Sequence, residues 1–436
     1  MLNEGIRIKY MKVFLDMVGC RLNQSELEAY ARQFRIAGHT LTSKAESADL
    51  IVINTCTVTA AAASDSRQMI RQAARSGANQ IIVTGCWATL NPRETAEFQG
   101  VSQVIGNLEK DRLVSTVLDI PVNEFNQWTI QRRPIPGSRM RTRAFIKVQD
   151  GCDNHCTYCI TRLARGSGRS REIDSILKDV HYALAGGTLE IVLTGVHLGS
   201  WGNDFVISSH LSGLVRAILS ETDTPRLRLS SLEPWDIYPD FFELWQNPRL
   251  CRHLHLPLQS GSEATLRRMG RRIKPESYAN LANQARATIP DVAITTDIIT
   301  GFPGETEAEF SESAAFVKAM DFANGHVFTY SARPGTVAAE LPDQVPYSIS
   351  KQRNAMMREI LHVSASAFQT EHLGQDMQVL WEKATPLDGH QWLLSGLTDN
   401  YLRVKSYFDA PCCNHIMVVH ITGMVNGGLI GEITHK

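Results

Sequence analysis

The sequence predicts an α/β protein of three parts: an N-terminal open α/β domain, a central partial (β/α)6 barrel and a C-terminal five-stranded antiparallel β-barrel. Three observations support this class. Apolar runs followed by helix-like stretches repeat three times in the first 120 residues, six more runs alternate with helix-length segments, and five short runs separated by turns end the chain. The length of 436 residues suits several domains, because one domain commonly takes about 100–200 residues.

The composition is that of a globular protein, with 43% hydrophobic residues, 20% charged residues and a net charge of −1. No stretch approaches the roughly 18 consecutive apolar residues of a membrane span, and residues 1–10 lack the pattern of a signal peptide. We therefore expect a cytoplasmic protein without a membrane partner. In that reducing compartment, closely spaced cysteines serve as metal ligands or catalytic groups more often than as disulfides.

The N-terminal domain, expected over residues 1–120, repeats an apolar run that ends in a cysteine. The runs are rich in Val and Ile, as buried parallel strands are, and span residues 12–20, 49–56 and 80–86. Because the carboxyl ends of parallel strands meet at one edge of a sheet, Cys20, Cys56 and Cys86 are expected to converge there. Gly19 and Gly85 permit tight turns at that edge. The alternative is three unrelated buried cysteines, packed as small hydrophobic residues.

A linker is expected over residues 121–141, where Pro121, Pro134, Pro136 and Gly137 lie among polar and basic residues. The central barrel is expected over residues 142–370, with strands at AFIKVQD, EIVLTGV, RLRLSS, HLHLPLQ, AITTDIITG and HVFTYS. The C-terminal barrel is expected over residues 371–436, with strands at MQVLWEKA, WLLSGLTD, YLRVKSY, IMVVHITGM and LIGEITHK.

The sharpest motif is Cys152-x3-Cys156-x2-Cys159, directly after a predicted strand. Three such thiolates can hold three corners of an iron–sulfur cluster, and because full protein ligation takes four, one iron would stay open to a small molecule. The alternative is a structural zinc site with His155 as fourth ligand, although such sites usually pair two close cysteines with a second distant pair. Cys251, Cys412 and Cys413 fit neither pattern, and we expect them to be packing residues or incidental thiols.

With Tyr158 before its last cysteine, this motif resembles the signature of radical S-adenosylmethionine (SAM) enzymes. The upstream contexts GCRLNQSE, NTCTVT and VTGCWA resemble the N-terminal domain of the methylthiotransferase subfamily. The C-terminal barrel lies where that family carries its TRAM domain, an oligonucleotide-binding-type module. The resemblance covers essentially the whole chain.

The residues after Cys20 separate the branches of that family. Arg21-Leu22-Asn23-Gln24 resembles the branch that acts on threonylcarbamoyladenosine in tRNA. The isopentenyladenosine branch tends to have Gln-Met-Asn there, and the ribosomal-protein branch Pro-Lys-Asn. One departure lies after Cys159, where the family commonly has a proline and an aromatic residue, while this chain has Ile160-Thr161-Arg162-Leu163.

The resemblance implies a transferase with two [4Fe-4S] clusters and SAM. One cluster, on Cys152, Cys156 and Cys159, would bind SAM and cleave it after one-electron reduction. The other, on Cys20, Cys56 and Cys86, would carry the sulfur. The product would bear a methylthio group on carbon 2 of threonylcarbamoyladenosine at position 37 of tRNA. That carbon carries an unactivated hydrogen, so its chemistry belongs to a cofactor, and we expect no catalytic acid–base side chain.

Contacts to SAM are carried over from the family motifs position by position. Each of the strand-end positions equally suits a packing residue, except Gly301, whose motif is more complete. Thr194 and Gly195 would face the methionyl group; Ser230, Ser231 and Glu233 would lie near the ribose or methionine; Ile299 and Gly301 would approach the adenine; Tyr158 would add a cofactor contact.

Residues 131–171 contain ten Lys or Arg residues and only two Asp or Glu residues, which indicates an RNA-facing belt around the cysteine loop. A second basic cluster spans residues 267–274. The expected partners are the anticodon loop of tRNA, bound with stacking by residues such as Trp392 or Tyr401, a one-electron donor such as flavodoxin or ferredoxin, and a sulfur source. The non-enzymatic alternative is an RNA-binding protein whose cysteines hold structural metal.

Overall fold

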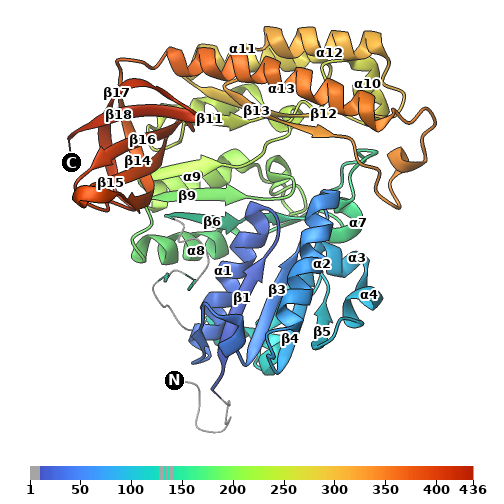
Figure 1. The fold of residues 1–436 in the computed structure, drawn as a ribbon, viewed down its shortest axis with the longest axis vertical. Coiled ribbons are helices and arrows are strands. Elements are labelled where there is room, and N and C mark those ends of the chain that lie inside the picture. The colour runs from blue at the N-terminus through green and yellow to red at the C-terminus, as the bar shows by residue number, and fades with distance from the viewer. Residues whose placement is uncertain (1–9, 127–131, 134, 137–141, 436) are drawn as a thin grey trace. The chain divides into compact units, whose positions relative to one another are not determined.

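The computed structural model describes residues 10–126, 132–133, 135–136 and 142–435, and it confirms the predicted class (Figure 1). Two compact units are present. The first comprises Met1–Asn154, Cys159–Gly187 and Thr194–Val196; the second comprises His155–Tyr158, Thr188–Leu193 and His197–Lys436. Pro134 and Gly137 of the expected linker lie outside the described residues. In the described part of the chain, no helix has both the length and the apolar character that crossing a membrane requires.

A five-stranded parallel sheet forms the centre of the first unit. Its order is β2 (Thr40–Leu41), β1 (Lys12–Met17), β3 (Leu50–Thr55), β4 (Gln80–Gly85) and β5 (Val101–Ile105). Alternate residues of β3 serve opposite faces: Leu50 and Val52 pack with α1 (Arg21–Ile36), while Ile51 and Ile53 pack with α2 (Ala60–Ala74). Both faces are therefore covered, which explains the unbroken apolar run of this strand.

The rest of the first unit consists of short elements and one longer helix. In chain order these are α3 (Cys86–Leu90), α4 (Pro92–Ala96), α5 (Leu113–Leu118), α6 (Val122–Asn126), β6 (Arg143–Lys147), β7 (Gln149–Asp150), α7 (Thr161–Arg165), β8 (Arg169–Ser170) and α8 (Ile173–Ala185). Strands β7 and β8 pair antiparallel. The loop with Cys152 and Cys159 runs between β7 and α7, so a short two-stranded ribbon frames its base.

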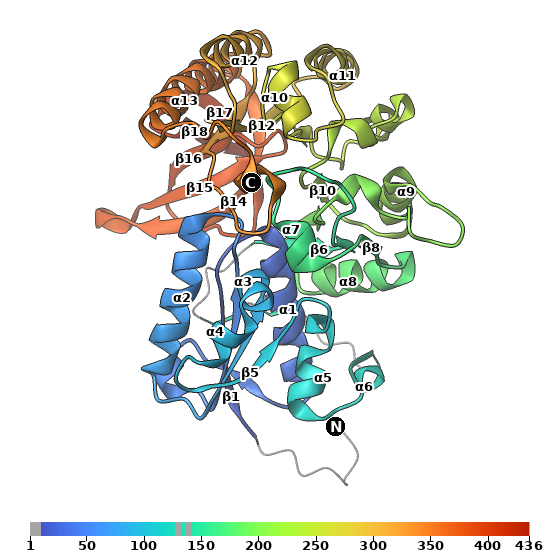
Figure 2. The ribbon, with the colours of Figure 1, turned by 90° about the vertical axis from the view of Figure 1, so that its right-hand side faces the viewer.

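The second unit contains the parallel strands that the alternating pattern predicts. Strand β9 (Glu190–Thr194) pairs with β10 (Arg226–Leu229), and β12 (Ala293–Thr300) lies between β11 (His253–His255) and β13 (Asn324–Thr329). A parallel bridge from Ser231 to His255 continues β10 towards β11. The helices are α9 (Leu211–Glu221), α10 (Glu263–Arg268), α11 (Pro275–Thr288), α12 (Glu307–Ala319) and α13 (Tyr347–Thr370). Figure 2 shows α12 beside α13, and α13 also packs on β12 and β13.

The C-terminal barrel is closed and five-stranded, as predicted. Its order is β14 (Asp376–Pro386), β15 (Trp392–Thr398), β16 (Arg403–Phe408), β18 (Gly428–His435) and β17 (Ile416–Val425). All pairs are antiparallel except β16 with β18, which run parallel, a detail that the sequence pattern does not predict. Arg226 and Arg228 of β10 donate hydrogen bonds to backbone carbonyls of this barrel, at Gln378, Leu397, Thr398 and Asp399.

Cys251 is a packing residue, as expected, with 2% of its surface exposed. Burial raises the pKa of its thiol to about 12, so the reactive thiolate is scarce at neutral pH. We expect iodoacetamide at pH 8 to leave Cys251 of the native protein unmodified while it alkylates the half-buried Cys412. Peptide mass spectrometry before and after unfolding in guanidinium checks this, and modification of Cys251 in the native state would contradict it.

Candidate functional site

The three upstream cysteines lie at the carboxyl edge of neighbouring strands. Cys20 precedes α1, Cys56 directly follows β3, and Cys86 is the first residue of α3. The expectation that each is the last residue of its strand is wrong, because β1 ends at Met17 and β4 ends at Gly85. The edge itself is the predicted one, since β1, β3 and β4 are adjacent and parallel.

Two glycines bring these cysteines together. Gly19 has a φ of +116°, and a Cβ there would lie 2.6 Å from the Cβ and 2.7 Å from the Sγ of Cys56. Gly85, with a φ of +96°, passes against the backbone of Thr55, where a Cβ would collide. Burial, and more weakly the nearby thiols of Cys20 and Cys86, raise the pKa of Cys56 to about 11. The three thiols are therefore close enough to influence one another.

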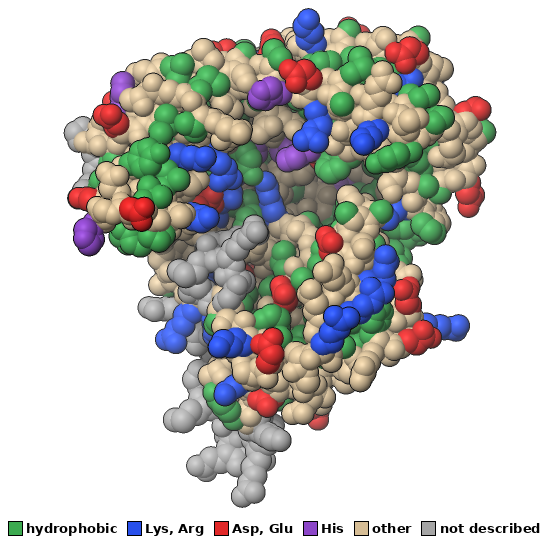
Figure 3. Space-filling view, viewed as in Figure 1, with side chains coloured by type: hydrophobic (Ala, Val, Ile, Leu, Met, Phe, Trp, Pro, Cys, Tyr) green, Lys and Arg blue, Asp and Glu red, His purple; other side chains and the backbone are tan. Residues whose placement is uncertain are grey.

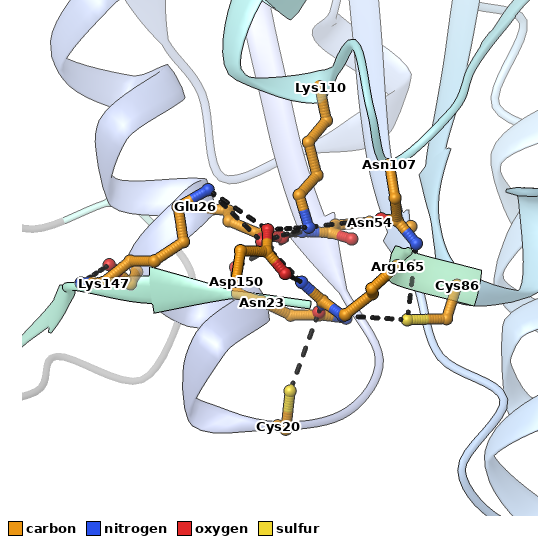
Figure 4. A network of polar contacts seen from close by, with 12 residues as sticks. Cys20, Asn23, Glu26, Asn54, Cys86, Asn107, Lys110, Lys147, Asp150 and Arg165 are labelled. Atoms are coloured by element: carbon orange, nitrogen blue, oxygen red, sulfur yellow. Dashed lines mark hydrogen bonds and ion pairs between the residues drawn. The ribbon is translucent and has the colours of Figure 1, made fainter. Parts of the chain in front are cut away.

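A buried guanidinium lies near the thiols of Cys20 and Cys86 (Figure 4). Arg165 of α7 donates from Nε to Cys86 Sγ at 3.2 Å and from Nη2 to Asn23 Oδ1 at 2.8 Å. Asn23 Oδ1 in turn accepts from Cys20 Sγ at 3.7 Å. From the other side, Asn107 Nδ2 approaches Cys86 Sγ at 3.6 Å. Two of the three thiols are thus bonded into one polar network.

The network is completed by buried ion pairs. Arg165 Nη1 lies 2.8 Å from Asp150 Oδ1 and 3.1 Å from Glu26 Oε1, and Lys110 Nζ lies 2.5 Å from Glu26 Oε1. Although burial opposes ionisation, Lys110, Arg165 and Lys147 hold the pKa of Glu26 at about 2, and Asp150 is likewise lowered. Burial also opposes the charge of Arg165, yet Glu26, Cys86, Asp150 and Cys20 together raise its pKa. The Glu26 and Asp150 carboxylates and the Arg165 guanidinium are therefore charged at neutral pH.

The cysteine loop is held by backbone hydrogen bonds, and its three thiols are half-buried. In the first unit, Cys152 N donates to Gly166 O at 3.0 Å. In the second unit, Thr157 N donates to Met269 O at 3.0 Å, and Thr157 O accepts from Ala338 N at 2.9 Å. The loop is therefore anchored at Cys152 within the first unit and at Thr157 within the second.

Tyr158 packs at the carboxyl end of β12, among residues carried over from the SAM motifs. Its ring meets Phe302 edge-on at 6.3 Å between centroids, and Ile299 and Tyr330 belong to the same apolar cluster. Gly301 has a φ of +72°, and a Cβ there would collide with Ser350 of α13. Packing alone therefore requires glycine at 301, and its contact with adenine stays a prediction.

Glu233 is paired with Arg271, a member of the basic cluster at residues 267–274. Arg271 Nη2 lies 2.7 Å from Glu233 Oε2, and the Trp235 ring covers the guanidinium at 4.4 Å. Burial opposes the charge of Arg271, but Glu233, and then Tyr158 and Cys156, raise its pKa. Arg271 is thus a buried cation near the cysteine loop, which no local sequence signal distinguished from its exposed neighbour Arg272.

The other carried-over residues lie at or just beyond strand ends. Ser230 and Ser231 follow β10, and Ser230 N donates to Leu193 O at 3.0 Å. Thr194 ends β9 and accepts at its carbonyl from Val148 N at 2.9 Å, and Gly195 comes next. This position agrees with that of ligand-binding groups in barrel enzymes, which lie at strand carboxyl ends.

The expected RNA-facing belt is wrong for its two buried members. Lys147 and Arg165 are 8% and 2% exposed and belong to the buried network. Arg132 is paired with Glu28, and Arg171 with Asp179. Arg133 and Arg162 are exposed, and Arg143 and Arg169 are half-buried. The two remaining members, Arg139 and Arg141, lie outside the described residues.

Among residues 10–126, 132–133, 135–136 and 142–435, no three His, Cys, Asp or Glu side chains are grouped as ligands of one metal ion. Each iron of an iron–sulfur cluster takes its own thiolate. The two cysteine triads offer the soft thiolate ligands that iron–sulfur clusters take. Two N–H groups donate to Cys86 Sγ, and Gly19 leaves free the space beside Cys56 that a side chain would fill. These features fit iron–sulfur clusters.

Comparison with known proteins gives the family. Residues 12–106 match the uncharacterized protein family UPF0004, and residues 146–317 match the radical SAM superfamily. The chain is 35% identical over 416 residues to threonylcarbamoyladenosine tRNA methylthiotransferase MtaB of Bacillus subtilis, covering 90% of this chain and 89% of the relative. It is 36% identical to MtaB of Thermotoga maritima, covering 85% and 86%.

A second group of relatives carries a different substrate in its name. The tRNA-2-methylthio-N(6)-dimethylallyladenosine synthase of Cereibacter sphaeroides is 32% identical, covering 97% of this chain and 98% of the relative. Among solved structures, the radical SAM methyltransferase TsrM of Kitasatospora setae, with tryptophan and aza-SAM bound, has a TM-score of 0.58 at 17% identity, covering 75% of both chains. This structural similarity shows that the two proteins share a fold. The chain belongs to the radical SAM methylthiotransferases of tRNA, a family of transferase enzymes.

Proposed function

We propose that the protein adds a methylthio group to carbon 2 of threonylcarbamoyladenosine at position 37 of tRNA. The observation that carries this substrate is the identity of 35% over 416 residues to MtaB of Bacillus subtilis, whose name specifies that nucleoside. The Arg21-Leu22-Asn23 motif after Cys20 points to the same branch. The alternative substrate is dimethylallyladenosine, because the relative from Cereibacter sphaeroides is 32% identical over 97% of this chain.

Two [4Fe-4S] clusters and SAM are the cofactors in this proposal. When bound, they supply the one-electron chemistry that an unactivated aromatic carbon requires, which side chains cannot provide. Cys152, Cys156 and Cys159 would ligate the cluster that binds SAM, and Cys20, Cys56 and Cys86 the cluster that carries sulfur. The residues proposed to contact SAM are Tyr158, Thr194, Gly195, Ser230, Ser231, Glu233, Ile299 and Gly301.

The chain's own residues orient these groups. Arg271 and Trp235 hold the Glu233 carboxylate in one place, so it can accept hydrogen bonds from a ligand without reorganising. Tyr158 and Phe302 form an apolar wall beside Ile299, which suits the flat face of an adenine ring and excludes water. The electron donor, for which we propose a flavodoxin or ferredoxin, and the sulfur source act from outside the chain.

For the anticodon loop, we propose the outer face of β16 in the C-terminal barrel. Arg403, Lys405 and Tyr407 alternate with the buried Val404 and Ser406, so the three side chains share that face, and Tyr407 is 56% exposed. Two cations with an exposed ring suit single-stranded RNA. In Figure 3, Lys and Arg side chains adjoin hydrophobic ones at the left, where Figure 1 draws the barrel.

This face replaces the stacking residues expected from the sequence. The ring of Tyr401 is stacked on His253 at 4.3 Å and lies under the Arg228 guanidinium, so it packs the barrel onto β10 and β11. Trp392 is half-buried against the barrel core. Tyr401 is therefore already stacked within the second unit, while base stacking by Trp392 stays a prediction.

Expression of the chain in a bacterial strain that lacks methylthio-threonylcarbamoyladenosine is expected to restore this nucleoside in tRNA hydrolysates measured by mass spectrometry. Cys156→Ala is expected to reduce it to background and to abolish reductive cleavage of SAM, because the loop then lacks one of its three thiolates. Cys56→Ala is expected to lose the methylthio nucleoside but to keep SAM cleavage, measured as 5′-deoxyadenosine.

The matched control is Cys412→Ala, a half-buried cysteine of the barrel that belongs to neither triad and whose loss should leave the product level unchanged. Restoration of methylthio-dimethylallyladenosine instead would transfer the assignment to the alternative substrate. Methylthio product from Cys56→Ala would rule out a sulfur-carrying role for the upstream cysteines.

A further inference from the structure

The family motifs account for the cysteines but give no role to Arg165, a buried cation of the first unit. Arg165 is 2% exposed and donates to four side chains: Cys86, Asn23, Glu26 and Asp150. An arginine needed only to neutralise carboxylates would not require a bond to sulfur. Its Nε lies 3.2 Å from Cys86 Sγ, within the distance expected for a hydrogen bond to sulfur.

The Cys86 sulfur accepts hydrogen bonds from two N–H groups, which lie on different segments of the chain. One is Arg165 Nε; the other is Asn107 Nδ2, at 3.6 Å, which also donates to Ala164 O at 2.7 Å. Lys110 Nζ donates to Asn107 Oδ1 at 3.2 Å, which fixes the amide with its NH2 group towards the sulfur. Such donors stabilise negative charge on a cysteine sulfur and tune a cluster bound to it.

Ion pairs hold the guanidinium in place beside the sulfur. Three buried cations, Arg165, Lys110 and Lys147, face the buried carboxylates Glu26 and Asp150, and Lys147 also pairs with the exposed Asp111 at 2.5 Å. The three cations are thus matched by three carboxylates. Two of these carboxylates bond Arg165 and keep it beside the Cys86 sulfur (Figure 4).

The same guanidinium is tied to the base of the cysteine loop. Asp150, which bonds Arg165, also accepts from Gly151 N at 2.9 Å, and Gly151 directly precedes Cys152. The residue after Arg165, Gly166, accepts from Cys152 N at 3.0 Å. Arg165 thus connects Cys86 to the chain segment that starts the Cys152–Cys159 motif, within the first unit.

We propose that Arg165, supported by Asn107, is the positioning residue of the upstream site: it orients the Cys86 sulfur, fixes Cys20 through Asn23, and raises the reduction potential of a cluster held there. This inference rests on the proposed function, in which the upstream triad holds a cluster. A hydrogen bond and a positive charge favour the more negative, reduced state.

The test measures the potential of the upstream cluster alone. In the full chain with Cys152, Cys156 and Cys159 replaced by alanine, the cluster is reconstituted anaerobically and titrated by EPR-monitored reduction. Asn107→Asp, which keeps the acceptor for Lys110 but replaces the N–H donor to sulfur by a carboxylate, is expected to decrease the reduced-to-oxidised ratio at fixed potential about tenfold. For a one-electron couple this is about 59 mV more negative. Arg165→Lys keeps the charge but loses the fork of donors, and a smaller shift in the same direction is expected.

Arg32→Gln is the matched control, because Arg32 is a half-buried arginine of the same unit that pairs with Asp179 and touches no cysteine. It is expected to leave the potential unchanged. Unshifted potentials in both Asn107→Asp and Arg165→Lys, with full iron and sulfide content, would overturn the proposal and show a purely structural role. Failure of the parent chain to take up about four irons would instead count against the proposed function.

Discussion

Replacement of Arg228 by methionine is expected to lower the free energy of unfolding by about 3–5 kcal/mol, because it leaves a buried carboxylate without its cation. Arg228 and Glu190 are fully buried and joined by two bonds, of 2.7 and 3.1 Å. Two of the three remaining N–H groups donate to Asp399 O at 2.8 Å and Thr398 O at 3.1 Å in the C-terminal barrel. The change therefore also frees two barrel carbonyls.

Chemical unfolding of the metal-free protein measures this loss. The double variant Arg228→Met with Glu190→Met is expected to recover part of it, because no buried charge then remains uncompensated. Arg252→Met is the control: Arg252 bonds Asp399 from a position 32% exposed, and exposed pairs contribute about 0–1 kcal/mol. Equal losses for Arg228→Met and Arg252→Met would show that burial of the pair does not determine its contribution.

Replacement of Glu26 by glutamine is expected to destabilise the first unit by a comparable amount, again about 3–5 kcal/mol. Glu26 is 1% exposed and lies 2.5 Å from Lys110 and 3.1 Å from Arg165, while its second oxygen accepts from Asn54 at 2.8 Å. Glutamine would leave two buried cations with only Asp150 as a buried partner. Glu28→Gln, at the outer pair with Arg132, is the control and is expected to cost much less.

The same residue gives a pH signature. Its pKa is about 2 in the folded protein against an ordinary 4.5, so the carboxylate stabilises the fold fully above about pH 4.5. This stabilisation, of about 3 kcal/mol, is lost as the pH falls from 4.5 towards 2. Below pH 4.5, the free energy of unfolding should therefore fall more steeply with decreasing pH for the wild type than for Glu26→Gln. If the free energy of unfolding changed with pH in parallel for the two proteins, the lowered pKa of Glu26 in the folded state would be contradicted.

The sequence predicted those parts of the fold that leave a periodic pattern. The buried run of β3 and the alternating strands of the C-terminal barrel were identifiable because every residue, or every second residue, faces a core. Strand β2 was missed, because two residues carry no period. The parallel pairing of β16 with β18 was also missed, since partner choice depends on barrel closure and not on local pattern.

The site was predicted as far as its cysteines and not beyond them. Arg165 and Lys147 were interpreted as RNA contacts because a buried cation and an exposed one look alike in a basic run. What distinguishes Arg165 is Glu26, 139 residues away in sequence, and Asp150, 15 residues away. Such pairing exists only once the chain is folded, so charge counting alone could not reveal it.

The close passage of Gly19 and Gly85 bears on how sequences of this family should be compared. Both positions need a backbone with positive φ, and Gly19 also leaves empty the space that a Cβ would take from Cys56. A chain that kept all three upstream cysteines but carried alanine at 19 would keep the ligand motif and lose the spacing between ligands. The signature of the upstream site therefore consists of five separate residues. Three are cysteines that supply sulfur, and two are glycines that are needed because they have no side chain.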